Sequence, residues 1–187
     1  MTLFDYHAHT PRCGHAEGPM EAYVERALAR GMGEFGFSEH SPWMIHDPGE
    51  WNCLRWAELP DYVADVRRIQ ERFDRVDGQR SFRVRLGLEA DFVPSRVAMA
   101  REVFAQYPWD YIIGSVHHLG FWCLPKHAQA QEYRRHRAED VYELYFELVR
   151  RMVRARFCDV IAHLDLPKKH GLRPDGGIMR YIEPLIP

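Results

Sequence analysis

The sequence lacks several features that would assign it to common classes of protein. No apolar run is long enough to span a bilayer, and the N-terminus has neither the basic nor the apolar region of a signal peptide. With 25 basic and 27 acidic residues, the formal net charge is −2, so no basic excess points to nucleic acid or an anionic membrane as a partner. The four cysteines form no Cys-x-x-Cys pair. We therefore expect a cytoplasmic protein with reduced thiols.

What is present is typical of a folded globular protein. Of the 187 residues, 46% are hydrophobic and 13% are aromatic, which is enough for a sizeable core. The sequence contains no internal repeat, low-complexity tract or domain linker. We expect one domain that covers residues 1–187.

Strand-like and helix-like patterns alternate along the chain. Such alternation predicts an α/β fold with parallel strands joined by right-handed crossovers, as a doubly wound sheet or a barrel. Gly31 is placed to end the first helix in a left-handed conformation, and Ser95 and Asp175 to cap two later helices. The predicted strands are 3–9, 34–40, 82–92, 111–117 and 160–166, and the predicted helices are 20–28, 59–73, 95–106, 141–153 and one from residue 176; residues 41–57 and 119–137 are predicted long loops.

Every predicted strand ends with, or contains, a side chain that binds transition metals. The carboxyl ends of parallel strands meet at one edge of a sheet, where α/β proteins bind their ligands. His7 and His9 are two residues apart, so both imidazoles lie on one face of their strand. Core packing requires none of these polar groups, and burying them unpaired is costly, so the set predicts a metal site. The candidate ligands are His7, His9, His15, His40, Glu89, His117 and His163.

Other polar residues near this edge have weaker claims. His118 is adjacent to His117, and only one of the two can face the site; His117 closes the apolar run and is preferred. Asp5 or Asp165 could accept a hydrogen bond from a ligand histidine and so fix its tautomer. Cys13 is expected to be a free loop thiol, with a soft metal ligand as the alternative. The remaining histidines are expected in solvent: His46, His127, His136 and His170.

Seven candidate ligands exceed the four that one tetrahedral ion needs, so two or three ions with Glu89 as a bridge are expected. Mixed nitrogen and oxygen ligands suit zinc, manganese or iron. Adjacent divalent ions suit the hydrolysis of phosphate esters, with Glu89 and His117 acting through a metal-bound hydroxide. Motifs for other phosphatase chemistries are absent: Cys-x5-Arg, a P-loop, and Asp-x-Asp after the first strand. The ligand set therefore predicts the hydrolysis of a phosphate ester.

With these residues, the sequence resembles the PHP (polymerase and histidinol phosphatase) superfamily, and within it the histidinol-phosphatase branch. The matching motifs are Asp-Tyr-His-Ala-His-Thr at 5–10, Cys-Gly-His-Ala at 13–16, Gly-Phe-Ser-Glu-His at 36–40, Gly-Leu-Glu-Ala-Asp at 87–91, Ile-Gly-Ser-Val-His at 113–117 and Ala-His-Leu-Asp-Leu-Pro-Lys-Lys at 162–169. The resemblance implies a distorted (βα)7 TIM-like barrel with three metal ions. It further implies that the protein releases phosphate from L-histidinol phosphate in histidine biosynthesis. As ligands of two ions it implies His7, His9, Glu89, His117 and His163, and of the third ion His15 and His40.

The sequence departs from the family at its end. Family members continue with two more strands and an Asp-x-His pair that supplies ligands, so about five βα units are expected here. Unpaired sheet edges would then favour self-association. Three functions stay open: a histidinol-phosphate phosphatase, a PHP phosphoesterase acting on nucleotides or DNA ends, and a shortened metal-binding protein without activity. The mildly acidic charge argues against the second. The candidates for substrate binding are Glu17, Lys168, Arg173, Lys169, Arg12 and the loop around Trp51 and Trp56.

Overall fold

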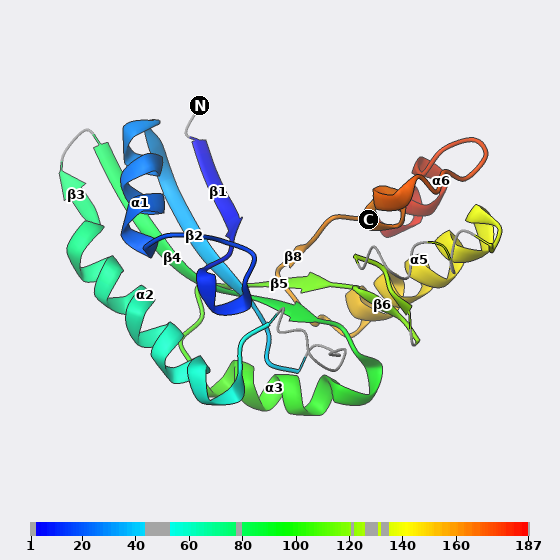
Figure 1. Ribbon diagram of the computed structural model, residues 1–187, viewed down its shortest axis with the longest axis horizontal. Helices are drawn as coiled ribbons and strands as arrows, with labels where there is room; N and C mark the ends of the chain where they lie inside the picture. The colour runs from blue at the N-terminus through cyan, green and yellow to red at the C-terminus, as the bar shows by residue number, and fades with distance from the viewer. Residues whose placement is uncertain are drawn as a thin grey trace. The chain divides into compact units, whose positions relative to one another are not determined.

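The computed structural model describes residues 3–43, 53–77, 80–120, 122–125, 131 and 135–186 (Figure 1). Five strands follow the order β1-β2-β4-β5-β8 in one sheet, and β3 pairs with β4 beside this path. The strand order and the intervening helices confirm the predicted α/β class. The chain divides into two compact units: Met1–Ala90 with Ala98–Ile113, and Asp91–Val97 with Gly114–Pro187. The prediction of one domain with fewer strands than its family stays a prediction.

Three parallel strands of the first unit position most of the candidate ligands. They are β1 (Leu3–Ala8), β2 (Met32–His40) and β4 (Arg80–Asp91), with β2 in the middle. Between β2 and β4 the register is regular and ends with His40 opposite Glu89. Most of β2 is buried, as expected of a parallel strand that is covered on both faces. A short strand that the sequence did not reveal, β3 (Arg75–Asp77), pairs antiparallel with the start of β4.

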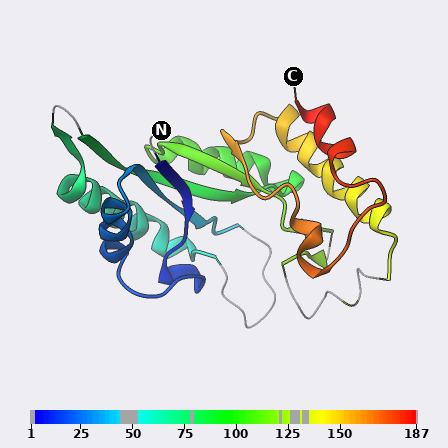
Figure 2. The same cartoon turned by 90° about the horizontal axis from the view of Figure 1, so that it is seen from above.

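Helices α1 (Met20–Ala29) and α2 (Leu59–Phe73) lie beside these strands (Figures 1 and 2). Both confirm the predicted ranges, and Gly31 follows α1 with a φ of +70°, as a left-handed helix end requires. The predicted cap at Ser95 is wrong. Pro94 starts a 3-10 turn one residue earlier, so Ser95 lies inside that turn and α3 (Val97–Gln106) begins after it. None of the helices among the described residues is long and apolar enough to cross a membrane.

Tyr111, the first residue of β5 (Tyr111–Ser115), packs closely on one glycine of β2 and one of β4. Its hydroxyl donates to the carbonyl oxygen of Tyr6 at 2.7 Å and lies 3.1 Å from that of Phe37. A Cβ at Gly36 would lie 2.3 Å from the hydroxyl oxygen, and one at Gly87 would lie 2.2 Å from ring atom Cζ. The ring therefore occupies the space that any side chain at these two positions would need.

We expect Gly87→Ala to destabilise the fold by about 1–3 kcal/mol, because the added methyl group overpacks a site that Tyr111 already fills. Urea denaturation monitored by circular dichroism measures the change. In a Tyr111→Leu background the ring is gone, so the same substitution should cost clearly less. An equal cost in both backgrounds would contradict the role given to Tyr111.

The second unit holds the remaining elements. They are the last two residues of β5, the hairpin of β6 (His118–Leu119) and β7 (Trp122–Cys123), α5 (Ala138–Arg154), β8 (Val160–Ile161) and α6 (Met179–Ile182). The β6–β7 hairpin lies where one long loop was predicted. Helix α5 confirms the predicted helix at 141–153 and extends it at both ends; within it Leu144 and Val153 are exposed, whereas Tyr142 and Phe146 are buried.

Two predictions near the end of the second unit are wrong. The fifth strand has two residues and His163 follows it. A 3-10 helix at Leu166–His170, with Pro167 in its first turn, takes the place of the strand's predicted end. Asp175 does not cap the last helix, which begins at Met179. Two glycines with positive φ, Gly176 and Gly177, turn the chain first.

Candidate metal centre

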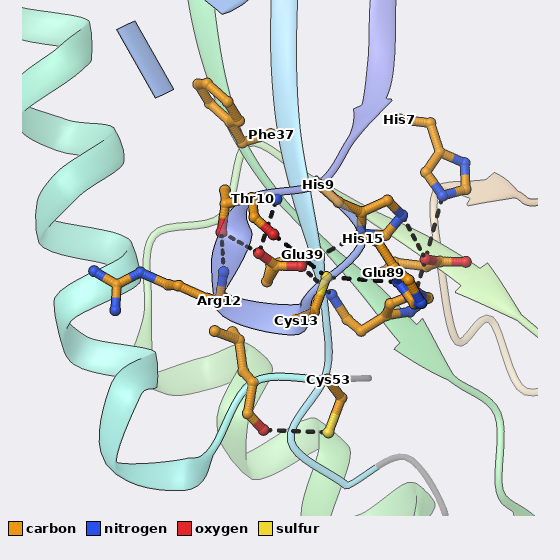
Figure 3. Close-up of polar contacts among 12 residues, drawn as sticks. His7, His9, Thr10, Arg12, Cys13, His15, Phe37, Glu39, Cys53 and Glu89 are labelled. Carbon is orange, nitrogen blue, oxygen red and sulfur yellow. Dashed lines mark hydrogen bonds and ion pairs between the residues drawn. The ribbon is translucent and has the colours of Figure 1, made fainter. Parts of the chain in front are cut away.

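Three imidazoles of the first unit surround one carboxylate oxygen (Figure 3). Oε2 of Glu89 lies 3.2 Å from Nε2 of His7, 3.4 Å from Nε2 of His9 and 2.9 Å from Nδ1 of His40. Glu89 is 1% exposed and His40 is 6% exposed, whereas the side chain of His7 is 34% exposed. The register explains this convergence, because His40 and Glu89 are paired at the carboxyl ends of β2 and β4. The cluster is therefore buried on one side and open at His7.

His15 joins this cluster from the loop after β1. Its ring centre lies 5.5 Å from that of His9 and 4.9 Å from that of His40. Two overlapping groups result, His7 with His9 and Glu89, and His9 with His15 and His40. In each group the ligand atoms all lie within 4.8 Å of one another. Ligands bound at about 2.1 Å around one tetrahedral ion are separated by roughly 3.4 Å, so both groups fit a divalent transition metal.

Glu39 lies behind His9, on the side away from Glu89. Its Oε1 is 3.3 Å from Nδ1 of His9 and its Oε2 accepts hydrogen bonds from the backbone N–H and the hydroxyl of Thr10. Burial alone would raise the pKa of this carboxyl, but hydrogen bonds from His9, Cys13 and Thr10 outweigh burial and leave the pKa lowered. The neighbouring Cys13 thiol has a raised pKa because it is buried and close to Glu39.

In the second unit, Asp91 holds two adjacent histidines. Its Oδ1 lies 3.3 Å from Nδ1 of His117 and accepts the backbone N–H of the same residue, and its Oδ2 lies 3.4 Å from Nδ1 of His118. Burial opposes the charge, yet the hydrogen bonds from both histidines hold the pKa of Asp91 well below its usual value. Burial would lower the pKa of His118, but Asp91 and Cys123 raise it to about 9. The ring centres of His117 and His163 are 5.0 Å apart.

The supporting carboxylates were assigned to the wrong residues from the sequence. Asp5 accepts the backbone N–H of His7, and Asp165 pairs with Lys168. Instead, Glu39 faces the ring nitrogen of His9 that points away from Glu89, and Asp91 faces ring nitrogens of His117 and His118. Both are acidic residues in buried strands next to a predicted ligand, and a buried carboxylate requires donors. That signal was available in the sequence.

The substrate-binding candidates have structural partners of their own. Glu17 is exposed and bonds Tyr23 through its backbone, and Arg12 pairs with Asp65 of α2. Arg173 donates to the carbonyl oxygens of Lys168 and Leu172.

The other aromatic and histidine predictions are settled only in part. Trp56 lies 6.2 Å from Trp43 between ring centres, and His136 is exposed, as predicted. Three predictions lie outside the described residues or side chains: those for Trp51, for His46 and His127, and for the side chain of His170.

Parallel strands that carry imidazole and carboxylate groups at their carboxyl ends define an α/β fold whose side chains are suited to hold metal ions. The family model of the PHP domain matches residues 5–185, and the chain belongs to this family. This membership confirms the resemblance found in the sequence motifs.

Relatives and solved structures agree with the family. The chain is 39% identical over 175 residues to a probable histidinol-phosphatase of Deinococcus radiodurans, covering 92% of this chain and 65% of the relative. It is 28% identical over 120 residues to a histidinol-phosphatase of Lactococcus lactis, covering 64% of this chain and 41% of the relative. The chain thus spans less than two thirds of the length of these curated relatives.

Two crystal structures share the fold. One is the histidinol phosphate phosphatase of Lactococcus lactis complexed with zinc, L-histidinol and phosphate, with a TM-score of 0.72, 23% identity, and coverage of 87% of this chain and 57% of that chain. The other is the putative histidinol phosphatase of Listeria monocytogenes, with a TM-score of 0.79, 19% identity, and coverage of 97% and 75%. Their likeness confirms the predicted PHP-type fold.

Proposed function

We propose that this chain is a metal-dependent phosphomonoesterase that hydrolyses L-histidinol phosphate to L-histidinol and phosphate, a step of histidine biosynthesis. The observation that carries the proposal is the Glu89 carboxylate with imidazole nitrogens of His7, His9 and His40 within 3.4 Å of one oxygen. Support also comes from the relative of Deinococcus radiodurans, which is named a probable histidinol-phosphatase. A structure with the same fold has zinc, L-histidinol and phosphate bound.

The proposed metal ligands are those predicted from the sequence, and the proposed ions are two or three of zinc, manganese or iron. The ligands are His7, His9, His15, His40, Glu89, His117 and His163. When bound, such ions neutralise phosphoryl oxygens and lower the pKa of a water molecule. Glu89 supplies the negative charge that two ions can share, and its burial keeps this carboxylate out of bulk water. His7, with its partly exposed side chain, marks the side from which a phosphate ester can reach the cluster.

The proposed substrate is a small phosphate ester, without nucleic acid as a partner. Self-association stays a prediction as well. It is supported by β1, the end strand of the sheet order, whose Leu3 and Phe4 are 55% and 65% exposed. Exposed apolar residues on an end strand favour pairing with another chain.

A phosphate-release assay tests this function. The purified chain, supplied with manganese or zinc, should release phosphate from L-histidinol phosphate faster than from AMP or from a 3′-phosphorylated DNA oligonucleotide. The reason is the formal net charge of −2, because proteins that bind nucleic acid usually carry a basic excess. A preference for either nucleotide substrate would reassign the substrate. Metal retained without any phosphate release would reduce the chain to a metal-binding protein.

A further inference from the structure

The imidazole of His9 lies between two buried carboxylates, with one ring nitrogen facing each of them (Figure 3). Its Nε2 is 3.4 Å from Oε2 of Glu89, and its Nδ1 is 3.3 Å from Oε1 of Glu39. The side chains of both glutamates are 0% exposed. A neutral imidazole carries a single proton, so only one of these two contacts can be a donated hydrogen bond.

The other partners of Glu39 decide which nitrogen carries that proton. Oε2 of Glu39 accepts from the backbone N–H of Thr10 at 3.0 Å and from the Thr10 hydroxyl, and Oε1 accepts from the backbone N–H of His40 at 3.3 Å. A carboxylate that accepts from three donors has no proton to give to His9. The remaining contact is satisfied when Nδ1 of His9 donates to Oε1. Nε2 then keeps its lone pair and directs it toward the Glu89 side.

We propose that Glu39 is a positioning residue that fixes His9 in the Nδ1–H tautomer and so makes Nε2 the ligand atom. This inference rests on the proposed function, since the lone pair is useful only if metal binds beside Glu89. Glu39 also holds the chain where β1 ends, because its bonds to Thr10 fix the residue that follows His9. One buried side chain thereby sets both the direction and the protonation of the histidine that the two ligand groups share.

A different use of the same side chains is a metal site of their own. His9, Cys13 and Glu39 each offer one atom, and these atoms lie within 4.8 Å of one another. The hydrogen bonds already made by Glu39 argue against it, because each carboxylate oxygen already accepts from a backbone or hydroxyl donor that an ion would have to displace.

The ligand atom of His9 can be read directly by long-range ¹H–¹⁵N NMR on the zinc-loaded protein. The expected spectrum of the wild-type chain has a protonated Nδ1 and a zinc-bound Nε2 for His9. Zinc bound through Nδ1, with the proton on Nε2, would overturn the proposal. Because the measurement uses no substrate, its outcome is independent of phosphatase activity.

Glu39→Gln tests the effect on metal binding. An amide has one accepting oxygen in place of two, so the His9 resonances should report mixed tautomers, and zinc affinity measured by competition with a chelator should fall about 10- to 100-fold. Glu34→Gln is the matched control, because Glu34 lies on the same strand but bonds Arg85. It should leave both readouts unchanged.

Two results would overturn the proposal through these variants. One is an unchanged tautomer and zinc affinity in Glu39→Gln. The other is a sulfur-to-cadmium charge-transfer band in the absorption spectrum of the cadmium-loaded wild type. If both Cys13→Ser and Glu39→Gln abolished this band, Glu39 would be a metal ligand and not a positioning residue.

Discussion

Glu89→Gln should lower phosphate release from L-histidinol phosphate by about 1,000-fold or more, because charge stabilisation by metal ions is worth several kcal/mol. The amide keeps the shape of the side chain but removes the negative charge that the imidazoles of His7, His9 and His40 surround. Steady-state kinetics at saturating manganese measures the loss. In Glu89→Gln we also expect added metal to raise Tm no longer, since a ligand raises Tm only if it binds the folded state and not the unfolded one.

The control for this variant is Glu102→Gln, which makes the same chemical change at an exposed residue of α3. It should retain wild-type kinetics and the wild-type response of Tm to metal. If Glu89→Gln kept activity within about threefold of wild type, a difference of less than 1 kcal/mol, Glu89 would not be the shared ligand.

His9→Ala should be more damaging than His15→Ala. His9 belongs both to the group with His7 and Glu89 and to the group with His15 and His40, whereas His15 belongs only to the second of these two. We expect on the order of a 10³-fold loss of kcat/KM for His9→Ala and a smaller loss of about 10- to 100-fold for His15→Ala. Kinetics over a range of metal concentrations measures both losses, and excess metal should restore part of the activity only in His15→Ala.

The exposed His136, which packs near Trp122, provides the matched control. His136→Ala should behave as wild type in the same assay. If His15→Ala lost as much activity as His9→Ala, the two groups would not be separable and the description of His9 as their shared member would be wrong.

The convergence of the ligands in the first unit could be predicted from the sequence. His40 and Glu89 each close an apolar strand, and parallel strands bring such ends to one edge. His7 and His9 followed from their two-residue spacing. The distances among these groups depend on the register of β2 with β4, which no local pattern specifies.

The supporting carboxylates show where residue-by-residue reasoning was too narrow. Asp5 and Asp165 were chosen because they lie close in sequence to predicted ligands. Glu39 and Asp91 were passed over although they lie in buried strands, where a carboxylate needs several donors to be tolerated. Glu39 reaches its histidine across 30 positions of the chain, so the pairing depends on the fold.

The second unit was harder to predict for a physical reason. Its strands β6, β7 and β8 have two residues each, too few for an alternating pattern to emerge. Local turn formers contributed instead: Pro167 lies in the 3-10 helix that replaces the end of the predicted fifth strand, and Gly176 and Gly177 turn the chain before the last helix. Helix α5 was recognised because its 17 residues carry a long apolar stripe.

Metal content tests the central claim most directly. After loading with zinc or manganese and dialysis against metal-free buffer, elemental analysis of the wild-type chain should find two to three ions per chain, as the candidate ligands predict. His9→Ala should retain clearly fewer, and His136→Ala as many as the wild type. A wild-type chain that retains no metal, or a His9→Ala variant that retains the full amount, would contradict the claim that these side chains form a metal centre.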